Sequence, residues 1–137
     1  MSETKTGIAA LMNSNLNAIP ERRKAEPGRY EGTLKVAKYE PDNKNKVFLA
    51  FGDLKDLDDS GRDLRGYENV MTSWTEDTPE AFLEDLGAFF RSHKNFRGDT
   101  NLAEMLPELP GKRYTFRIER DRKKPEYTNV RAIRAIE

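Results

Sequence analysis

The chain has 137 residues, enough for one domain, and its 24 Lys and Arg balance 24 Asp and Glu, which excludes a strongly basic nucleic-acid-binding tail. The absence of cysteine excludes disulfides, cysteine-ligated zinc, iron–sulfur clusters and thiol catalysis. The longest apolar runs have five residues and the first residues show no apolar signal core, so we expect a soluble, cytoplasmic protein.

Residues 1–28 are predicted to form a flexible N-terminal arm. This segment is rich in Asn and Pro, its main apolar stretch is Ile8–Met12, and it ends at Pro27-Gly28. The ordered domain is therefore expected to span residues 29–137.

Three strands are predicted next, from apolar residues at alternate positions. The first spans about 29–39, and its core face would hold Tyr30, Gly32, Leu34 and Val36. After a turn at 40–46, the second strand would bury Val47, Leu49 and Phe51, which leaves Phe48 pointing outward. An acidic turn at 52–61 leads to a third strand at 62–74, with a bulge near Gly66.

A helix is predicted over 78–93, because Thr78 can cap its N-terminus, Pro79 suits the first helical position and a stripe of apolar residues follows. A second short helix is predicted at 102–106. The chain then ends in two strands joined by a basic turn at 121–126. Tyr114, Phe116 and Ile118 alternate in the first of these strands, and Tyr127, Val130 and Ile133 lie in the second.

This order of elements predicts a mainly β fold. Five strands with one helix between strands three and four is the order of the OB-fold, a small, partly open barrel. We therefore expect a five-stranded OB-fold-like barrel preceded by the flexible arm.

The charges are segregated along the chain. Residues 53–85 hold eleven acidic and three basic side chains, whereas residues 112–134 hold nine basic and three acidic ones. A basic flank of this kind can bind a polyanion, although opposite flanks can also simply neutralise each other.

The candidate binding residues follow from the OB-fold, whose groove lies over strands two and three between two loops. Lysines in the first loop and on strand two, the basic turn, and outward aromatic rings would contact phosphates and bases. For Phe48 and Trp74 a place in the core is the alternative. The predicted nucleic-acid-binding residues are Lys44, Lys46, Phe48, Arg65, Tyr67, Trp74, Arg117, Arg122, Lys123 and Lys124.

Several segments resemble a family of phage-encoded OB-fold proteins that bind single-stranded DNA. They are the strand openings Pro27–Gly32 and Gly61–Leu64, the helix Leu83–Phe90, the entry Leu109–Lys112 and the closing segment Tyr127–Ile133. The resemblance implies largely sequence-independent binding of single-stranded DNA during replication or recombination. Replication or recombination proteins, or further copies of the chain, would be its partners.

Other chemistry has little support in the sequence. His93 is the only histidine and is expected at the surface or in the C-terminal turn of the helix, so no catalytic residue, cofactor or metal is predicted. Asp56–Gly61 matches part of a calcium loop, but Tyr67 occupies the position of the bidentate Glu, which favours a plain turn. The alternative function is an OB-like interaction or inhibitor module whose acidic flank mimics DNA and binds a host or phage protein.

Overall fold

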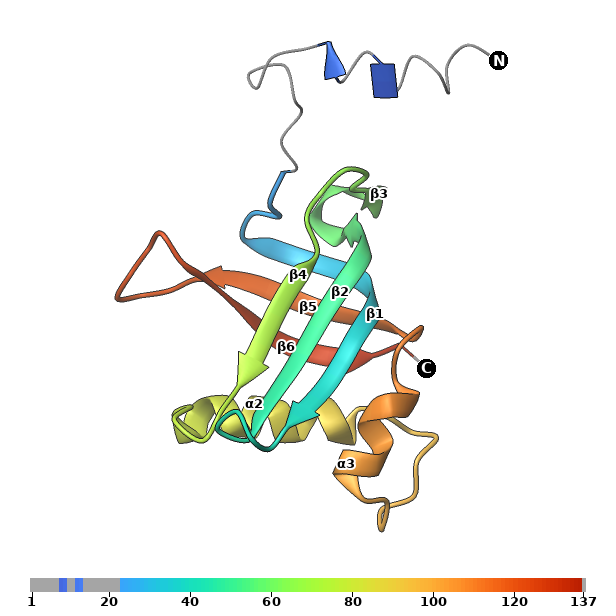
Figure 1. Cartoon of the computed structure of the whole chain (residues 1–137), viewed down its shortest axis with the longest axis vertical. Helices are drawn as coiled ribbons and strands as arrows, with labels where there is room; N and C mark the ends of the chain where they lie inside the picture. Colours follow the sequence, from blue (N-terminus) through green and yellow to red (C-terminus); the bar gives the residue numbers. More distant parts are fainter. Residues whose placement is uncertain (1–7, 10–11, 14–22, 137) are drawn as a thin grey trace.

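The computed structural model describes residues 8–9, 12–13 and 23–136, and this part of the chain is mainly β (Figure 1). Its strands form one antiparallel sheet in the order β3-β2-β1-β5-β6, and β4 pairs with β2 as well. The strands are β1 Gly28–Glu40, β2 Lys46–Asp56, β3 Arg62–Asp63, β4 Val70–Trp74, β5 Arg113–Arg120 and β6 Thr128–Ala135. The helices are α2 Glu80–Arg91 and α3 Leu102–Met105, with 3-10 turns η2 Leu57–Asp59 and η3 Leu106–Glu108.

The prediction of five strands was wrong, because the segment at 62–74 divides into β3 and β4. Gly66 has a φ of +77°, a left-handed conformation that an extended strand does not contain. The segment between the two strands stays close to the sheet, since the Leu64 N–H donates to the Leu54 carbonyl at 2.9 Å. The sheet therefore has six strands.

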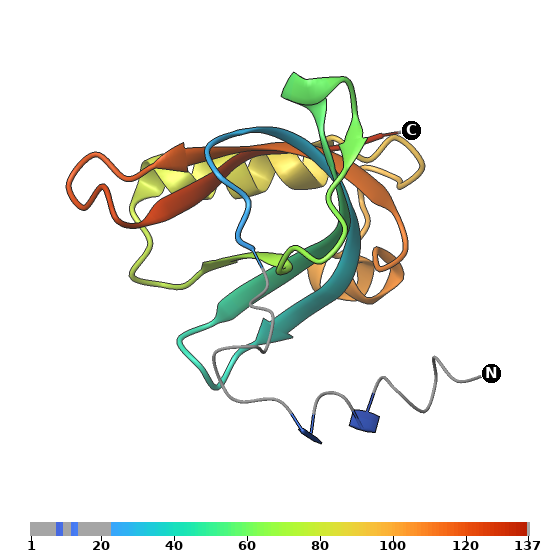
Figure 2. The same cartoon turned by 90° about the horizontal axis from the view of Figure 1, so that it is seen from above.

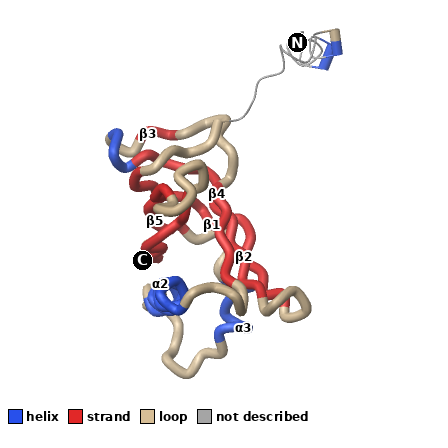
Figure 3. The backbone as a smooth tube through the Cα atoms, turned by 90° about the vertical axis from the view of Figure 1, so that its left-hand side faces the viewer, coloured by secondary structure: helices blue, strands red, loops and turns tan. Residues whose placement is uncertain are grey.

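The expected barrel is not confirmed, since no ladder between β4 and β6 closes the sheet in the described residues. The helix expected at 78–93 is present as α2 and the short one at 102–106 as α3, so two helices lie between β4 and β5. Both helices lie at one end of the sheet and β3 lies at the other (Figure 3). No described helix is long and apolar enough to cross a membrane.

A β-bulge in β1 changes which of its side chains face the core. The pairing of β1 with β2 shifts between Leu34 and Val36. Leu34 is fully buried, and after the shift Ala37 packs against the core instead of Val36. The prediction that Val36 faces the core was therefore wrong, because the bulge inserts one residue into the alternation.

Aromatic rings from three elements form the centre of the core. The Phe51 ring of β2 lies 5.0 Å from that of Phe116 and 5.8 Å from that of Tyr114, both on β5. Phe89 of α2 adds a third contact, with its ring 5.5 Å from that of Tyr114. Helix α2 thus packs on the strands through a fully buried phenyl ring.

His93 follows α2 as predicted, but it is buried rather than at the surface. Its Nδ1 lies 3.1 Å from the Phe90 carbonyl, which only accepts, so Nδ1 carries the proton. Its Nε2 then accepts a hydrogen bond from the Tyr114 hydroxyl at 2.6 Å. The imidazole links the helix to β5.

The start of α2 differs from the prediction. Pro79 is the N-cap residue, without a side-chain hydrogen bond to the helix. The Thr78 hydroxyl instead accepts from the Thr75 N–H at 2.8 Å and stabilises the turn before the helix.

Most of the predicted flexible arm at 1–28 lies outside the described residues. Its last part is held against the sheet, because Arg23 forms a parallel bridge with Tyr67 and its carbonyl accepts from the Glu68 N–H at 2.7 Å.

Candidate nucleic-acid interface

One face of β1, β2 and β4 carries side chains that are outside the core. Residues directly opposite each other in a sheet share a face, and two such rows cross these strands. They are Lys38–Phe48–Ser73 and Val36–Ala50–Met71, which we call the outer face. Their sequence neighbours Leu49 and Phe51 are fully buried on the other side.

Phe48 is at the centre of the outer face. Its ring is half-buried and is not part of the core cluster, which agrees with the outward orientation expected from the sequence. The Lys46 Nζ lies 5.4 Å from the ring centroid, a cation–π contact. Lys38 is exposed and makes no ion pair with the described residues, so its charge is available for a phosphate.

The β5–β6 hairpin carries a second lysine–aromatic pair. The Lys124 Nζ lies 5.9 Å from the ring centroid of Tyr127, which is 60% exposed. The turn is held by the Lys124 N–H, which donates to the Asp121 carboxylate at 3.1 Å. Arg122 and Lys123 are exposed in the same turn, and the hairpin extends away from the rest of the sheet (Figure 2). The sequence placed Tyr127 in the last strand, whereas β6 begins one residue later, at Thr128.

The first predicted loop, between β1 and β2, offers less free positive charge to the candidate interface than expected. Lys44 is in the turn between β1 and β2, where its Nζ lies 2.9 Å from the Asp77 carboxylate. This hydrogen bond raises the pKa of Lys44 and keeps its ammonium charged. Part of its charge is thus neutralised within the chain.

Arg65 and Tyr67 lie beyond the other end of the outer face. Arg65 lines a polar pocket of about 470 Å³, together with Lys35 and Lys55. Tyr67 lines the same pocket, but it is half-buried under the arm and pairs with Arg23. The structure therefore places these two predicted residues together, apart from the row that contains Phe48.

Trp74 belongs to the core, so its prediction as a binding residue was wrong. It is 5% exposed, and its indole Nε1 donates to the Phe82 carbonyl at 3.0 Å. The indole of Trp74 thus joins β4 to α2. Its position directly opposite Val47 on the core face explains the burial.

Arg117 is exposed but lies away from the outer face. It is on β5, which β1 separates from β2, and it pairs with Glu119 at 2.9 Å. The structure does not bring it next to Phe48.

Three residues of the candidate interface were missed: Lys38, Met71 and Tyr127. Met71 is 62% exposed beside Ala50, and Lys38 is directly opposite Phe48. Lys38 could have been found from its position opposite Phe48 on the neighbouring strand. The bulge in β1 shifts this pairing, so it cannot be counted from the sequence.

Two of the acidic residues after β2 form ion pairs with arginines. Asp58 accepts from the Arg29 backbone N–H at 2.9 Å and from its Nε at 2.8 Å, and these bonds lower the pKa of Asp58. Asp59 pairs with Arg62 at 2.7 Å, and Asp56 caps η2. In the described part of the chain, no three or more His, Cys, Asp or Glu side chains are arranged to hold a metal ion.

No family model matches the chain, and neither does any curated protein.

Proposed function

We propose that this protein binds single-stranded DNA through the outer face and the tip of the β5–β6 hairpin. The observation that carries the proposal is the repeated pairing of a lysine with an outward aromatic ring, Lys46 with Phe48 and Lys124 with Tyr127. Aromatic rings stack on unpaired bases at about 1–3 kcal/mol per base. The neighbouring ammonium groups neutralise phosphates and release counterions.

The strand order supports an OB-like fold for this function. β1 lies between β2 and β5, β4 pairs with β2, and α2 packs between β4 and β6 at one end of the sheet. This matches the order expected for a partly open barrel, with β4 as the third strand and β6 as the fifth. The outer face is then the surface over strands two and three, where OB-folds bind oligonucleotides.

The composition of the outer face favours single strands over duplexes. Its accessible centre is apolar, with Phe48 and Met71 beside the buried Ala50, and lysines lie at its margins. In a duplex the bases are stacked on one another and their faces are covered, so such a centre gains contact only with exposed bases. Binding would therefore be tolerant of sequence, and the resemblance to phage proteins is our reason for proposing a role in replication or recombination.

The alternative of an acidic protein-binding module has less support. Five of the eleven acidic residues at 53–85 make ion pairs within the chain, which weakens a continuous acidic surface. They are Asp53, Asp58, Asp59, Asp77 and Asp85.

Fluorescence anisotropy with labelled oligo-dT of about 12 nucleotides tests the proposal. At about 50 mM salt we expect a micromolar or lower Kd, which rises at about 200 mM salt. A duplex of the same length should bind more weakly. Absence of oligo-dT binding at the lower salt concentration refutes the proposed function.

A further inference from the structure

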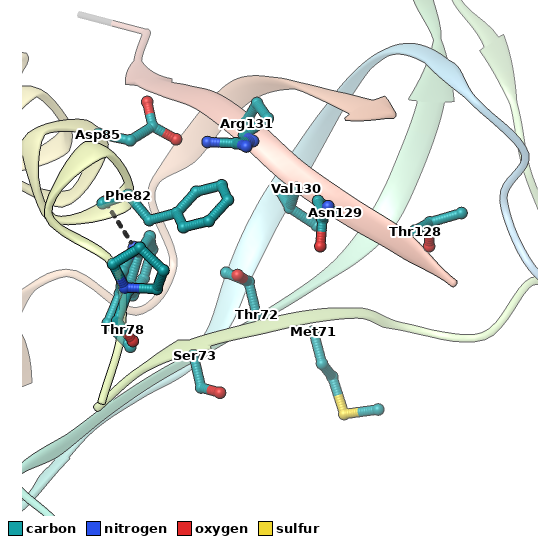
Figure 4. Close-up of a pocket in the computed structure, with 12 residues that line it drawn as sticks. Met71, Thr72, Ser73, Thr78, Phe82, Asp85, Thr128, Asn129, Val130 and Arg131 are labelled. Carbon is teal, nitrogen blue, oxygen red and sulfur yellow. Dashed lines mark hydrogen bonds between the residues drawn. The ribbon is translucent and has the colours of Figure 1, made fainter. Parts of the chain in front are cut away.

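The two unpaired strand edges of the sheet enclose a pocket. The free edge of β4 faces that of β6 across a gap, which we call the seam, and a pocket of about 370 Å³ opens there (Figure 4). Helix α2 closes one end, where Phe82 accepts from Trp74 and the Asp85 carboxylate accepts from the Ala132 N–H at 3.2 Å. The other end is open, beside Met71 and Thr128.

The width of the seam argues against an added strand. Cα atoms of β4 and β6 approach within 8 Å of each other. A peptide inserted as a strand between them would need about 9.6 Å, two strand spacings. The seam is therefore too narrow for another strand at its closest point, although it forms no ladder itself.

The lining of the pocket is polar and has no excess charge. Thr72 from β4 and Asn129 from β6 point toward each other across the seam (Figure 4). The Asn129 Nδ2 donates to the Asp121 carboxylate at 3.4 Å, so the amide oxygen is the atom that Asn129 offers to a ligand in the seam. Asp85 and Arg131 are its only charged residues, and the Arg131 guanidinium lies 3.7 Å from the centroid of the Phe82 ring. The Arg131 Nε is buried without a hydrogen-bond partner. These features favour a neutral ligand rich in hydrogen-bonding atoms over a phosphate.

The pocket lies between the two lysine–aromatic pairs. Ser73, which lines it, is directly opposite Phe48 in the sheet. On the other side, Thr128 lines it and directly follows Tyr127. A strand of DNA that contacts both Phe48 and Tyr127 therefore crosses the seam.

We propose that the seam pocket takes one nucleobase of the bound strand and reads its edge through the Asn129 amide and the Thr72 hydroxyl. The inference rests on the proposed function and adds to it a base preference at one position. Bases are neutral and carry donors and acceptors on their edges, as the lining requires. The stacking rings alone would tolerate every base.

The test compares four labelled oligonucleotides of about 12 nucleotides. They are oligo-dT, oligo-dC, oligo-dA and alternating dT–dG, which together present every base. For the wild-type protein we expect at least a fivefold difference in Kd between the best and the weakest. In Asn129→Ala and in Thr72→Val the difference should fall below about twofold, through loss of affinity for the best oligonucleotide. Thr72→Ser keeps the hydroxyl and should keep the preference, as should Asn95→Ala, a matched control in an exposed loop.

Kd values within twofold of one another for the wild-type protein overturn the inference and leave the proposed function intact. A preference that persists in both folded variants also overturns it, because the discrimination then lies elsewhere. If Asn129→Ala unfolds, the comparison of Thr72→Val with Thr72→Ser is sufficient to test the inference. Absence of binding to all four oligonucleotides refutes the proposed function itself.

Discussion

Replacing Phe48 with Ala is the most direct test of the outer face. The substitution removes the ring under the Lys46 ammonium and leaves both Lys46 and Lys38 in place. If one base stacks on this ring, the loss is about 1–3 kcal/mol, which corresponds to a rise in Kd of about 5- to 150-fold. The dependence of Kd on salt should stay unchanged, because stacking releases no counterions.

The effect on stability distinguishes this position from the core. Phe48 is half-buried and outside the core cluster, so we expect its removal to lower the free energy of unfolding by about 1 kcal/mol. Phe51→Ala, at a fully buried ring between Tyr114 and Phe116, should cost about 3–5 kcal/mol. Urea unfolding of the two variants measures the contrast.

Anisotropy titrations with oligo-dT at several salt concentrations measure the binding effect. Phe48→Trp should retain affinity, since it keeps a stacking surface. Phe96→Ala is the matched control, because Phe96 is also half-buried with a lysine, Lys112, 6.0 Å from its ring centroid, but it is outside the sheet. If Phe48→Ala binds as tightly as wild type, or if Phe96→Ala weakens binding equally, the stacking argument is wrong.

Three further predictions concern single side chains. Lys38→Ala should reduce the slope of log K against log salt by about 0.7, the value for one phosphate contact on a single strand. An unchanged slope in the same titrations would show that Lys38 does not contact the DNA. Because Arg29 lowers the folded-state pKa of Asp58, the stabilisation from this pair is present above the unfolded-state pKa and is lost as the pH falls through the lower folded value. The difference in urea-unfolding stability between wild type and Asp58→Asn should therefore shrink below about pH 4, and a constant difference would contradict the assignment. Trp74→Phe removes the indole hydrogen bond to Phe82 and should lower the urea-unfolding midpoint, whereas an unchanged midpoint would contradict the role of this hydrogen bond in joining β4 to α2.

The sequence predicted the positions of the strands better than it predicted which of their side chains face the core. In β2 the pairing with β4 runs without a register shift from Val47 to Phe51, so the outward orientation of Phe48 follows from counting alone. In β1 the bulge after Leu34 reverses the alternation, and Val36 and Lys38 thereby move to the outer face. A bulge is a property of how two strands pair, so the residue pattern of one strand alone does not predict it.

Residues whose position depends on tertiary contacts were harder to predict. Trp74 is the kind of large aromatic residue that often stacks on bases. Its burial depends on α2, which supplies the Phe82 carbonyl as an acceptor. His93 resembles a surface residue at a helix end until β5 supplies the Tyr114 hydroxyl. In both cases the deciding partner belongs to another element of the fold.

The double pairing of β1 has a consequence for how the chain reaches its native state. Its first half pairs with β5, about 80 residues later in the chain, while nearly its whole length, from Tyr30 to Glu40, pairs with β2 through a short turn. The β1–β2 hairpin can form early, but the outer face rests on Phe51, whose ring partners arrive only with β5. A nascent chain that ends before residue 113 would therefore display the outer face without the aromatic layer that supports it. Closure between β1 and β5 is then the slow, non-local step of folding, and the outer face becomes rigid only when that step is complete.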